Sequence, residues 1–313
     1  MSAASTATIN WPLTTYAQGL MQDRLAAYRL AGLLVPIVQV TAAAGTFKKF
    51  DDRNDFLVTD TLRGLGGHAK RMNIEATNDT YLCQPHALEI AKDDWEMDLV
   101  GSGAGALSSE LIDQGKIRSL LARKATGYAK RAVDFAFGAL TPVADRGNFS
   151  SNDIDPIDQL DEQLAALATD VATTENIKVI MSVDVWRKIR ANAKVKARAG
   201  GVKTSVKRED LTDMLLYPVE LEISGVVATA TKRGQTTVTK SQIVGNYVIL
   251  LHTTPSATIN DPSAFKCFST SSALVDAVRT YREESASSDV HKIDWSEDMK
   301  QTSALAARLL AIT

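Results

Sequence analysis

The longest amphipathic segment of the chain, residues 106–137, limits what this sequence can fold into. Its apolar residues recur at multiples of three to four positions, at Leu107, Leu111, Leu121, Tyr128, Ala132 and Phe135. This spacing predicts one face of an α-helix, and Ser109 and Glu110 suit its first turn. A continuous helix of this length would span roughly 48 Å, although Gly115 and Gly127 mark places where it could break.

The polar side of this segment is basic. Its positively charged residues are Arg118, Arg123, Lys124, Lys130 and Arg131. A solvated helix face is the simplest interpretation, and a face turned toward DNA is the alternative. The whole chain has 35 basic and 37 acidic residues, a net charge of −2. That balance argues against tight wrapping of nucleic acid, but it does not exclude a surface that faces DNA.

The first hundred residues contain few core-forming side chains. Residues 1–46 read as an arm, with a helix over about 16–34 that Pro36 should end and an extended segment over 35–40. Residues 47–100 read as a long polar hairpin whose glycines, near position 66, favour a turn. An isolated two-stranded hairpin is marginally stable in water. It is therefore either an ordinary surface hairpin or an interaction arm that docks on another subunit.

Residues 153–268 predict a compact α/β domain because helical and extended patterns alternate along them. Asp155 and Pro156 form a helix start, with aspartate as N-cap and proline in the first helical position. Further helices are expected over 182–195 and 209–216, and strands are expected over 177–181, 219–231 and 242–253. Beyond this domain, 275–282 resembles a strand, whereas 291–295 and 299–313 are compatible with either strand or helix.

Chemistry-bearing motifs are sparse. The run Gly101-Ser102-Gly103-Ala104-Gly105 precedes a helix, as a nucleotide-binding loop does, but an acidic segment stands where the buried strand should be, and the later acidic residue is missing. The histidines and the two cysteines lack metal-ligand spacing. No apolar run reaches the ~20 residues that span a bilayer. We therefore expect no cofactor, no metal, no membrane segment and no enzyme activity.

The composition also favours burial against other copies of the chain. Of the 45% apolar residues, many are among the 42 alanines, and only 19 residues are aromatic. Bulky apolar side chains dominate the hydrophobic gain of folding, because that gain scales with the apolar area removed from water. A chain of this kind is expected to complete its burial in an assembly.

The order of segments resembles the major capsid proteins of tailed bacteriophages, with the Hong Kong 97-type fold. The resemblance is carried by a series of short motifs. In sequence order they are Val35-Pro36-Ile37-Val38, Phe47-x-x-Phe50-Asp51, Tyr81-x-Cys83, Ala87-Leu88, the basic long helix, Asp155-Pro156-Ile157, residues 177–181, Trp186, Tyr281-Arg282-Glu283-Glu284, Ser288-Asp289-Val290 and Trp295-Ser296. The resemblance covers nearly the whole chain. Its specificity lies in order and spacing, because each motif alone is weak.

This resemblance implies an α+β fold with five parts. They are an N-terminal arm (1–46), an extended β-hairpin loop (47–100), a peripheral domain with a long spine helix (101–152), an α/β axial domain (153–268) and a return to the peripheral domain as strands (269–313). The extended loop would lie on a neighbouring subunit. The residues that we expect at subunit contacts are Phe47, Phe50, Phe56, Arg63, Lys70, Arg71 and Tyr81. In place of the glycine that family members often carry near the last strand, this chain has Ala306-Ala307-Arg308.

The implied function is structural. The chain would self-assemble into hexamers and pentamers of an icosahedral phage shell that encloses double-stranded DNA, bound non-specifically on its inner face. Portal proteins, and scaffolding or decoration proteins, would be partners, and assembly would take place in the bacterial cytoplasm before the protein becomes part of the virion. Two alternatives stay open: an encapsulin-type protein compartment with protein cargo, and an α/β enzyme that binds a nucleotide through Gly101–Gly105.

Overall fold

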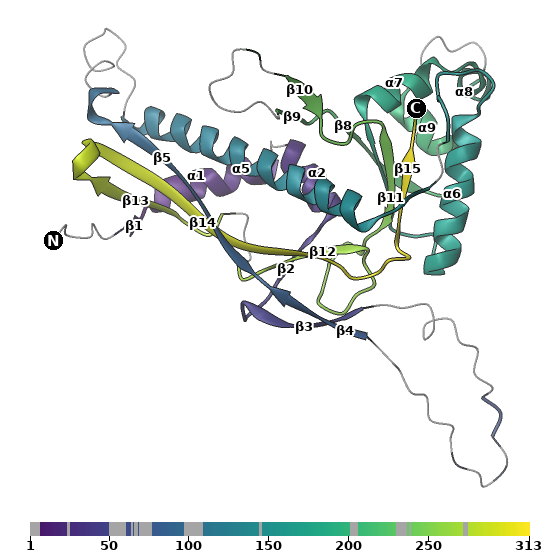
Figure 1. Cartoon of the computed structure of the whole chain (residues 1–313), viewed down its shortest axis with the longest axis horizontal. Helices are drawn as coiled ribbons and strands as arrows, with labels where there is room; N and C mark the ends of the chain where they lie inside the picture. The colour runs from purple at the N-terminus through teal and green to yellow at the C-terminus, as the bar shows by residue number, and fades with distance from the viewer. Residues whose placement is uncertain are drawn as a thin grey trace.

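Two β-sheets stand at opposite ends of an elongated molecule, and one long helix runs along it (Figure 1). This computed structural model describes residues 7–23, 26–49, 61–63, 65, 68, 77–96, 109–143, 146–200, 206–229, 237, 239–271 and 275–313. The first sheet has six strands and the second has five. Two short hairpins lie outside both sheets.

The six-stranded sheet is organised by one long strand, β14. It pairs antiparallel with β5 along one edge, and with β13 and then β12 along the other; β1 and β2 close the two ends. The strands are β1 (Thr8–Ile9), β2 (Ile37–Gln39), β5 (Gln84–Asp93), β12 (Phe265–Ser269), β13 (Val278–Glu283) and β14 (Ser288–Gln301), with a short 3₁₀ turn, Glu284–Ala286, between the last two. Segment 84–93, which the sequence placed in the extended loop, thus belongs to this sheet.

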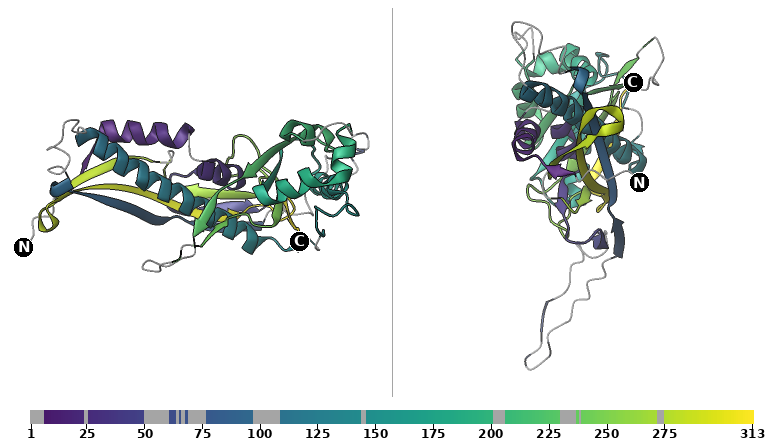
Figure 2. Two further views of the ribbon diagram at one scale, coloured as in Figure 1. Left: turned by 90° about the horizontal axis from the view of Figure 1, so that it is seen from above. Right: turned by 90° about the vertical axis from the view of Figure 1, so that its left-hand side faces the viewer.

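Three helices cover one face of the six-stranded sheet (Figure 2). They are α1 (Trp11–Asp23), α2 (Ala26–Leu34) and α5 (Ser109–Ala139). The predicted arm helix is therefore two helices, and it ends before Pro36 as expected. At 31 residues, α5 spans about 46 Å and confirms the predicted long helix. Its two interior glycines do not break it. Each costs roughly 1 kcal/mol relative to alanine, and the buried face of the helix outweighs that cost.

The five-stranded sheet is buried on both faces. Its strands are β6 (Pro142–Val143), β7 (Ile177–Ser182), β8 (Val219–Ser224), β11 (Tyr247–His252) and β15 (Ala307–Ala311), in the order β6-β15-β11-β7-β8. Along β7, Val179 and Met181 face a core built with α6 (Pro156–Val171), α7 (Val183–Ala191), α8 (Ala193–Arg198) and α9 (Arg208–Met214). Ile180 faces the opposite core, which α2 and α5 share. The alternating side chains of this sheet therefore join the two ends of the molecule.

The last strand corrects one expectation. Residues 269–313 were expected to return to the peripheral part of the chain, and β13 and β14 do so. However, β15 pairs with β11 in the five-stranded sheet. The reason is visible in Leu309 and Leu310, which are both buried, one in each core. Two consecutive buried leucines suit a central strand covered on both faces, and this excludes the helical alternative for residues 307–311.

Capping residues determine where the helices around the five-stranded sheet begin. Asp155 caps α6 by accepting a hydrogen bond from the Ile157 backbone N–H at 3.1 Å, and Pro156 takes the first helical position, as predicted. The expected helix over 182–195 is divided at Asn192. Its buried side chain accepts hydrogen bonds from the backbone of Lys194 and Val195, and this starts α8 as a separate helix.

Asn192 also ties α7 and α8 to the preceding linker. Its side-chain nitrogen donates to the carbonyls of Phe149, Ser151 and Ile154 at 2.8–3.0 Å. The residue is fully buried, so water cannot replace these partners. One asparagine therefore shares its two N–H donors among three carbonyls of an irregular segment.

We expect Asn192→Ala to lower the free energy of unfolding by about 3 kcal/mol, because buried carbonyls would lose their donors. Chemical denaturation of unassembled protein measures this change. The exposed neighbour Asn152 accepts one long hydrogen bond, from the Ala193 N–H, so Asn152→Ala is a matched control that should cost under ~1 kcal/mol. Equal losses in the two variants would contradict the role given to Asn192.

Candidate assembly surfaces

The base of the extended loop is a short hairpin held by aromatic contacts. Strands β3 (Ala44–Lys49) and β4 (Thr77–Leu82) pair antiparallel, with Lys49 opposite Thr77. The rings of Phe47 and Tyr81 both pack on Phe268 of β12, with centroids 5.1 and 4.6 Å away. Paired aromatic rings add stabilisation beyond the area that they bury. Phe268 therefore anchors the hairpin to the six-stranded sheet.

Hydrogen bonds fix the same hairpin at its exit. The Leu82 N–H donates to Asp298 of β14 at 2.7 Å, and the Cys83 thiol donates to the Phe268 carbonyl at 3.4 Å. Lys49 and Asp79 form a cross-strand ion pair of 2.7 Å. The hydrogen bond from Lys49 lowers the pKa of the Asp79 carboxyl. Both partners of this pair are partly exposed, so it contributes little to stability.

The structure places three of the seven residues predicted at subunit contacts. Phe47 and Tyr81 are 2% and 7% exposed within their own subunit, so they fasten the loop base and leave almost no surface for a neighbour. Sequence reasoning missed this because their partner, Phe268, lies about 190–220 positions away. Arg63 is exposed. The remaining four, Phe50, Phe56, Lys70 and Arg71, lie outside the described residues.

A loop between β11 and β12 packs beside this base. Ala257 and Ile259 contact the Phe47–Tyr81–Phe268 cluster. Asp261 organises the loop: it accepts hydrogen bonds from the Thr258 N–H at 2.6 Å and from the hydroxyls of Thr254 and Ser263. Its carboxylate also pairs at 3.0 Å with the fully buried Lys266. Burial raises the pKa of Asp261, but the hydrogen bonds outweigh burial and lower that pKa to about 2.

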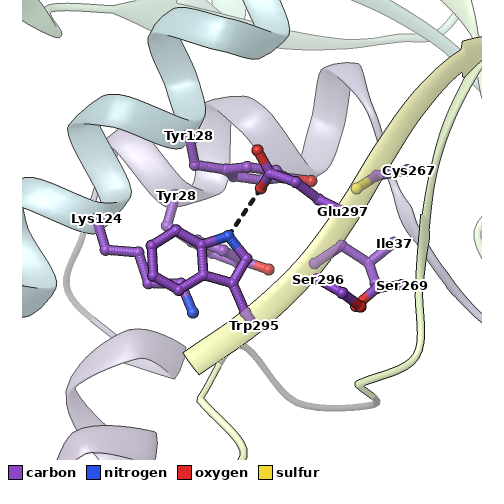
Figure 3. A pocket seen from close by; sticks show the side chains of 9 residues that line it. All are labelled: Tyr28, Ile37, Lys124, Tyr128, Cys267, Ser269, Trp295, Ser296 and Glu297. Atoms are coloured by element: carbon purple, nitrogen blue, oxygen red, sulfur yellow. Dashed lines mark hydrogen bonds between the residues drawn. The ribbon is translucent and has the colours of Figure 1, made fainter. Parts of the chain in front are cut away.

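A second cluster joins α5 to β14 across a small cavity (Figure 3). The Lys124 ammonium lies 4.4 Å from the centroid of the Trp295 ring. The indole N–H of Trp295 donates to Glu297 at 3.0 Å, and Glu297 also pairs with Arg131 at 2.6 Å. His86 of β5 stacks on Trp295. Two of the basic residues predicted on the solvent side of the helix thus face the sheet.

A third cluster contains a hydroxyl, an imidazole and a carboxylate in line. His291 Nδ1 lies 3.1 Å from the Thr280 hydroxyl, and its Nε2 lies 3.1 Å from Asp113. Asp113 is bound at 2.7 Å by the buried Lys92, and His291 is buried between strands and helix. The arrangement therefore ties α5, β5, β13 and β14 together.

The described part of the chain bears on two other kinds of site, metal centres and membrane-spanning helices. Within those residues, no group of three or more His, Cys, Asp or Glu side chains could hold a metal ion. The same residues include no helix that is long and apolar enough to cross a bilayer. The glycine run 101–105 lies outside the described residues. The described surface is instead one of ion pairs, exposed loops and an anchored hairpin.

We expect Gly45→Ala to loosen the loop base. A Cβ atom at this position would lie 2.5–2.9 Å from the Tyr81 ring, so the ring would have to leave Phe268 at a cost of about 1–3 kcal/mol. Amide hydrogen exchange in β3 and β4 should accelerate at least tenfold, with β7 and β11 unchanged. Gly138→Ala is the control, because nothing lies near its Cβ position. Unchanged exchange in Gly45→Ala would contradict the anchoring role of Tyr81.

Lys124 predicts a pH dependence of stability. Burial lowers the pKa of this lysine to about 8, below its unfolded value of about 10.4. The unfolded state therefore holds more protons between these values, and stability should rise with pH in this window. From pH 7.5 to 10 the lysine should contribute roughly 2 kcal/mol of this rise. Lys124→Met should lack this component, as denaturation at several pH values would show. If the free energy of unfolding changed with pH in the same way in the wild type and in Lys124→Met, this role of Lys124 would be contradicted.

Among comparisons with known proteins, only the solved structures bear on the fold. No family model matches the sequence, and a search of curated proteins finds no relative. Among solved structures, a phage-related protein from Bordetella bronchiseptica is 17% identical, covers 98% of both chains and has a TM-score of 0.72. The capsid structure of cyanophage P-SCSP1u is 9% identical over 90% of this chain and 86% of its own, with a TM-score of 0.55.

A virus-like particle from Pyrococcus furiosus also matches, with 8% identity, 95% and 97% coverage and a TM-score of 0.55. At these identities the similarity concerns the fold. It extends over nearly the whole chain, including the arm, both sheets and the long helix. The chain therefore has the α+β capsid fold of the Hong Kong 97 type, as the resemblance implied.

Proposed function

We propose that this chain is the major capsid protein of a tailed bacteriophage. Its copies would assemble into hexamers and pentamers of an icosahedral shell that encloses double-stranded DNA. The observation that carries this proposal is the match of fold over nearly the whole chain with a phage-related protein and with a cyanophage capsid. The role is one of association, and catalysis has no part in it.

The geometry of the loop base supports an assembly role for the extended loop. The base, β3 and β4, is fastened to its own subunit through Phe268 and Asp298. Since Phe47 and Tyr81 are used there, contacts with a neighbour would fall to Arg63 and to the predicted residues Phe50, Phe56, Lys70 and Arg71. Many small contacts of this kind, repeated over a closed shell, add up to a stable assembly.

Further partners follow from this role. A shell of this type needs a portal for DNA entry, and scaffolding or decoration proteins are additional partners. The protein would assemble in the bacterial cytoplasm and end as part of the virion. The proposed domains keep the sequence boundaries, except that residues 84–93 and 307–311 are assigned by the sheets in which they pair.

An encapsulin-type compartment is the second candidate. The fold of this chain also matches that of a virus-like particle from Pyrococcus furiosus, and this match supports the second candidate. The two functions differ in content: a phage shell holds DNA, and a compartment holds protein cargo. Nuclease-protected DNA in shells from the native host would support the phage shell, whereas a co-purifying enzyme would support the compartment. Nucleotide-dependent thermal stabilisation would instead revive the enzyme alternative.

The register of the loop base allows a precise deletion test. Lys49 and Thr77 are cross-strand partners, so residues 50–76 can be replaced by Asn-Gly, which favours a tight hairpin turn. We expect this variant to fold with wild-type thermal stability as a subunit, but to form no regular shells by negative-stain electron microscopy. Shells of normal stability from this variant would contradict the assembly role of the loop. Absence of shells from the wild-type chain would contradict the capsid function itself.

A further inference from the structure

A groove of about 490 Å³ lies between the middle of α5 and the hairpin of β9 (Val227–Thr229) and β10 (Lys240–Gln242). Figure 1 shows this hairpin beside α5. The lining residues are Ala122, Arg123, Thr126, Gly127, Lys130, Val227, Ala228, Thr229 and Lys240. Most of these side chains are small, and the groove is open to solvent.

The rim of this groove is positively charged. Arg123, Lys130 and Lys240 are all exposed. Asp134 on the next turn of α5 pairs with Lys130. Within the described part of the chain, no carboxylate forms an ion pair with Arg123 or Lys240. The groove therefore keeps most of its positive charge, although the whole chain is slightly acidic.

The other basic residues of α5 named above do not line the groove. Lys124 and Arg131 face β14, where Trp295 and Glu297 engage them. Arg118 is exposed on the same helix but does not line the groove. Arg123 and Lys130 are seven residues apart on one face of α5, about 10 Å along its axis. They can therefore contact different anionic groups of one extended ligand.

We propose that this groove binds the phosphate backbone of DNA without reading its sequence. Lysine and arginine are the residues that neutralise phosphates. Among the described residues, no aromatic side chain lines the groove, so these residues offer no ring on which a base could stack. The same lack of aromatic residues disfavours an acidic protein segment, since protein interfaces are enriched in aromatic anchors. This inference rests on the proposed capsid function, and it assigns the DNA-facing surface of the shell.

Three cations predict weak binding with a defined salt dependence. Each neutralised phosphate of duplex DNA contributes about −0.9 to the slope of log K against log salt concentration. The groove should therefore give a slope of about −2.7. Such binding is easily reversed, which suits DNA that must leave the shell.

The test measures fluorescence anisotropy of a labelled 20-base-pair DNA of random sequence with unassembled subunits over a range of NaCl concentrations. The variant Arg123→Ser, Lys130→Ser, Lys240→Ser should lose nearly the whole slope. Arg118→Ser should keep the wild-type slope, since this arginine lies on the same helix outside the groove. Asp134→Asn should bind DNA more tightly, because Lys130 would no longer share its charge. This gain distinguishes a binding role from damage to the fold.

Several outcomes would overturn the inference. They are an unchanged slope in the triple variant, a loss in Arg118→Ser as large as in the triple variant, no DNA binding by the wild type, and tighter binding of a 20-residue polyglutamate than of DNA. Electron microscopy of the same preparations separates this inference from the capsid proposal. Regular shells with an unchanged triple variant would reject the groove alone, whereas the absence of wild-type shells would reject the proposed function.

Discussion

The packing of α5 against both sheets holds the two ends of this molecule together. Its first half places Ile117, Leu120 and Leu121 against α1 and the six-stranded sheet. Its second half enters the core that the five-stranded sheet shares with α2. There the buried face is a stripe of alanines, at Ala125, Ala129, Ala132 and Ala136. Small side chains let helices approach closely. The alanine-rich composition therefore serves a tight junction, as well as any burial against other copies.

Polar contacts then fix how α5 lies on the sheet. An apolar stripe alone allows a helix to rotate or slide by small amounts. Lys124 on Trp295 and Arg131 on Glu297 accept only one arrangement, and Lys92 and His291 hold Asp113 near the other end. Removing one partner of such a buried pair is costly, because the remaining charge stays in a poorly solvated place. The clusters therefore define the position of the long helix more than they add net stability.

Elements set by local signals were predictable from the sequence. The spacing of apolar residues at three to four positions predicted α5. The N-cap Asp155, followed by Pro156, predicted the start of α6. Pairing between distant segments was not predictable in the same way. β5 pairs with β14, which lies about 200 positions later in the chain. The side chains of β5 alternate between exposed and partly buried, and such a sequence pattern is equally compatible with a polar loop. Phe47 and Tyr81 show the same limit. They are the apolar residues that an interaction arm would offer, but Phe268 buries them within the subunit, and no local pattern near residue 47 indicates Phe268.

This use of Phe47 and Tyr81 affects how an extended loop can work in an assembly. A hairpin with no anchor would lose much conformational entropy on docking to a neighbour. With its base fastened at Phe268 and Asp298, the direction in which β3 and β4 leave the body is already fixed, so less entropy remains to be lost. The same anchor involves only three rings and a few hydrogen bonds, so local opening at the base need not disturb the two cores. In the proposed shell, a loop whose base opens locally would be able to adjust to slightly different neighbours in fivefold and sixfold rings.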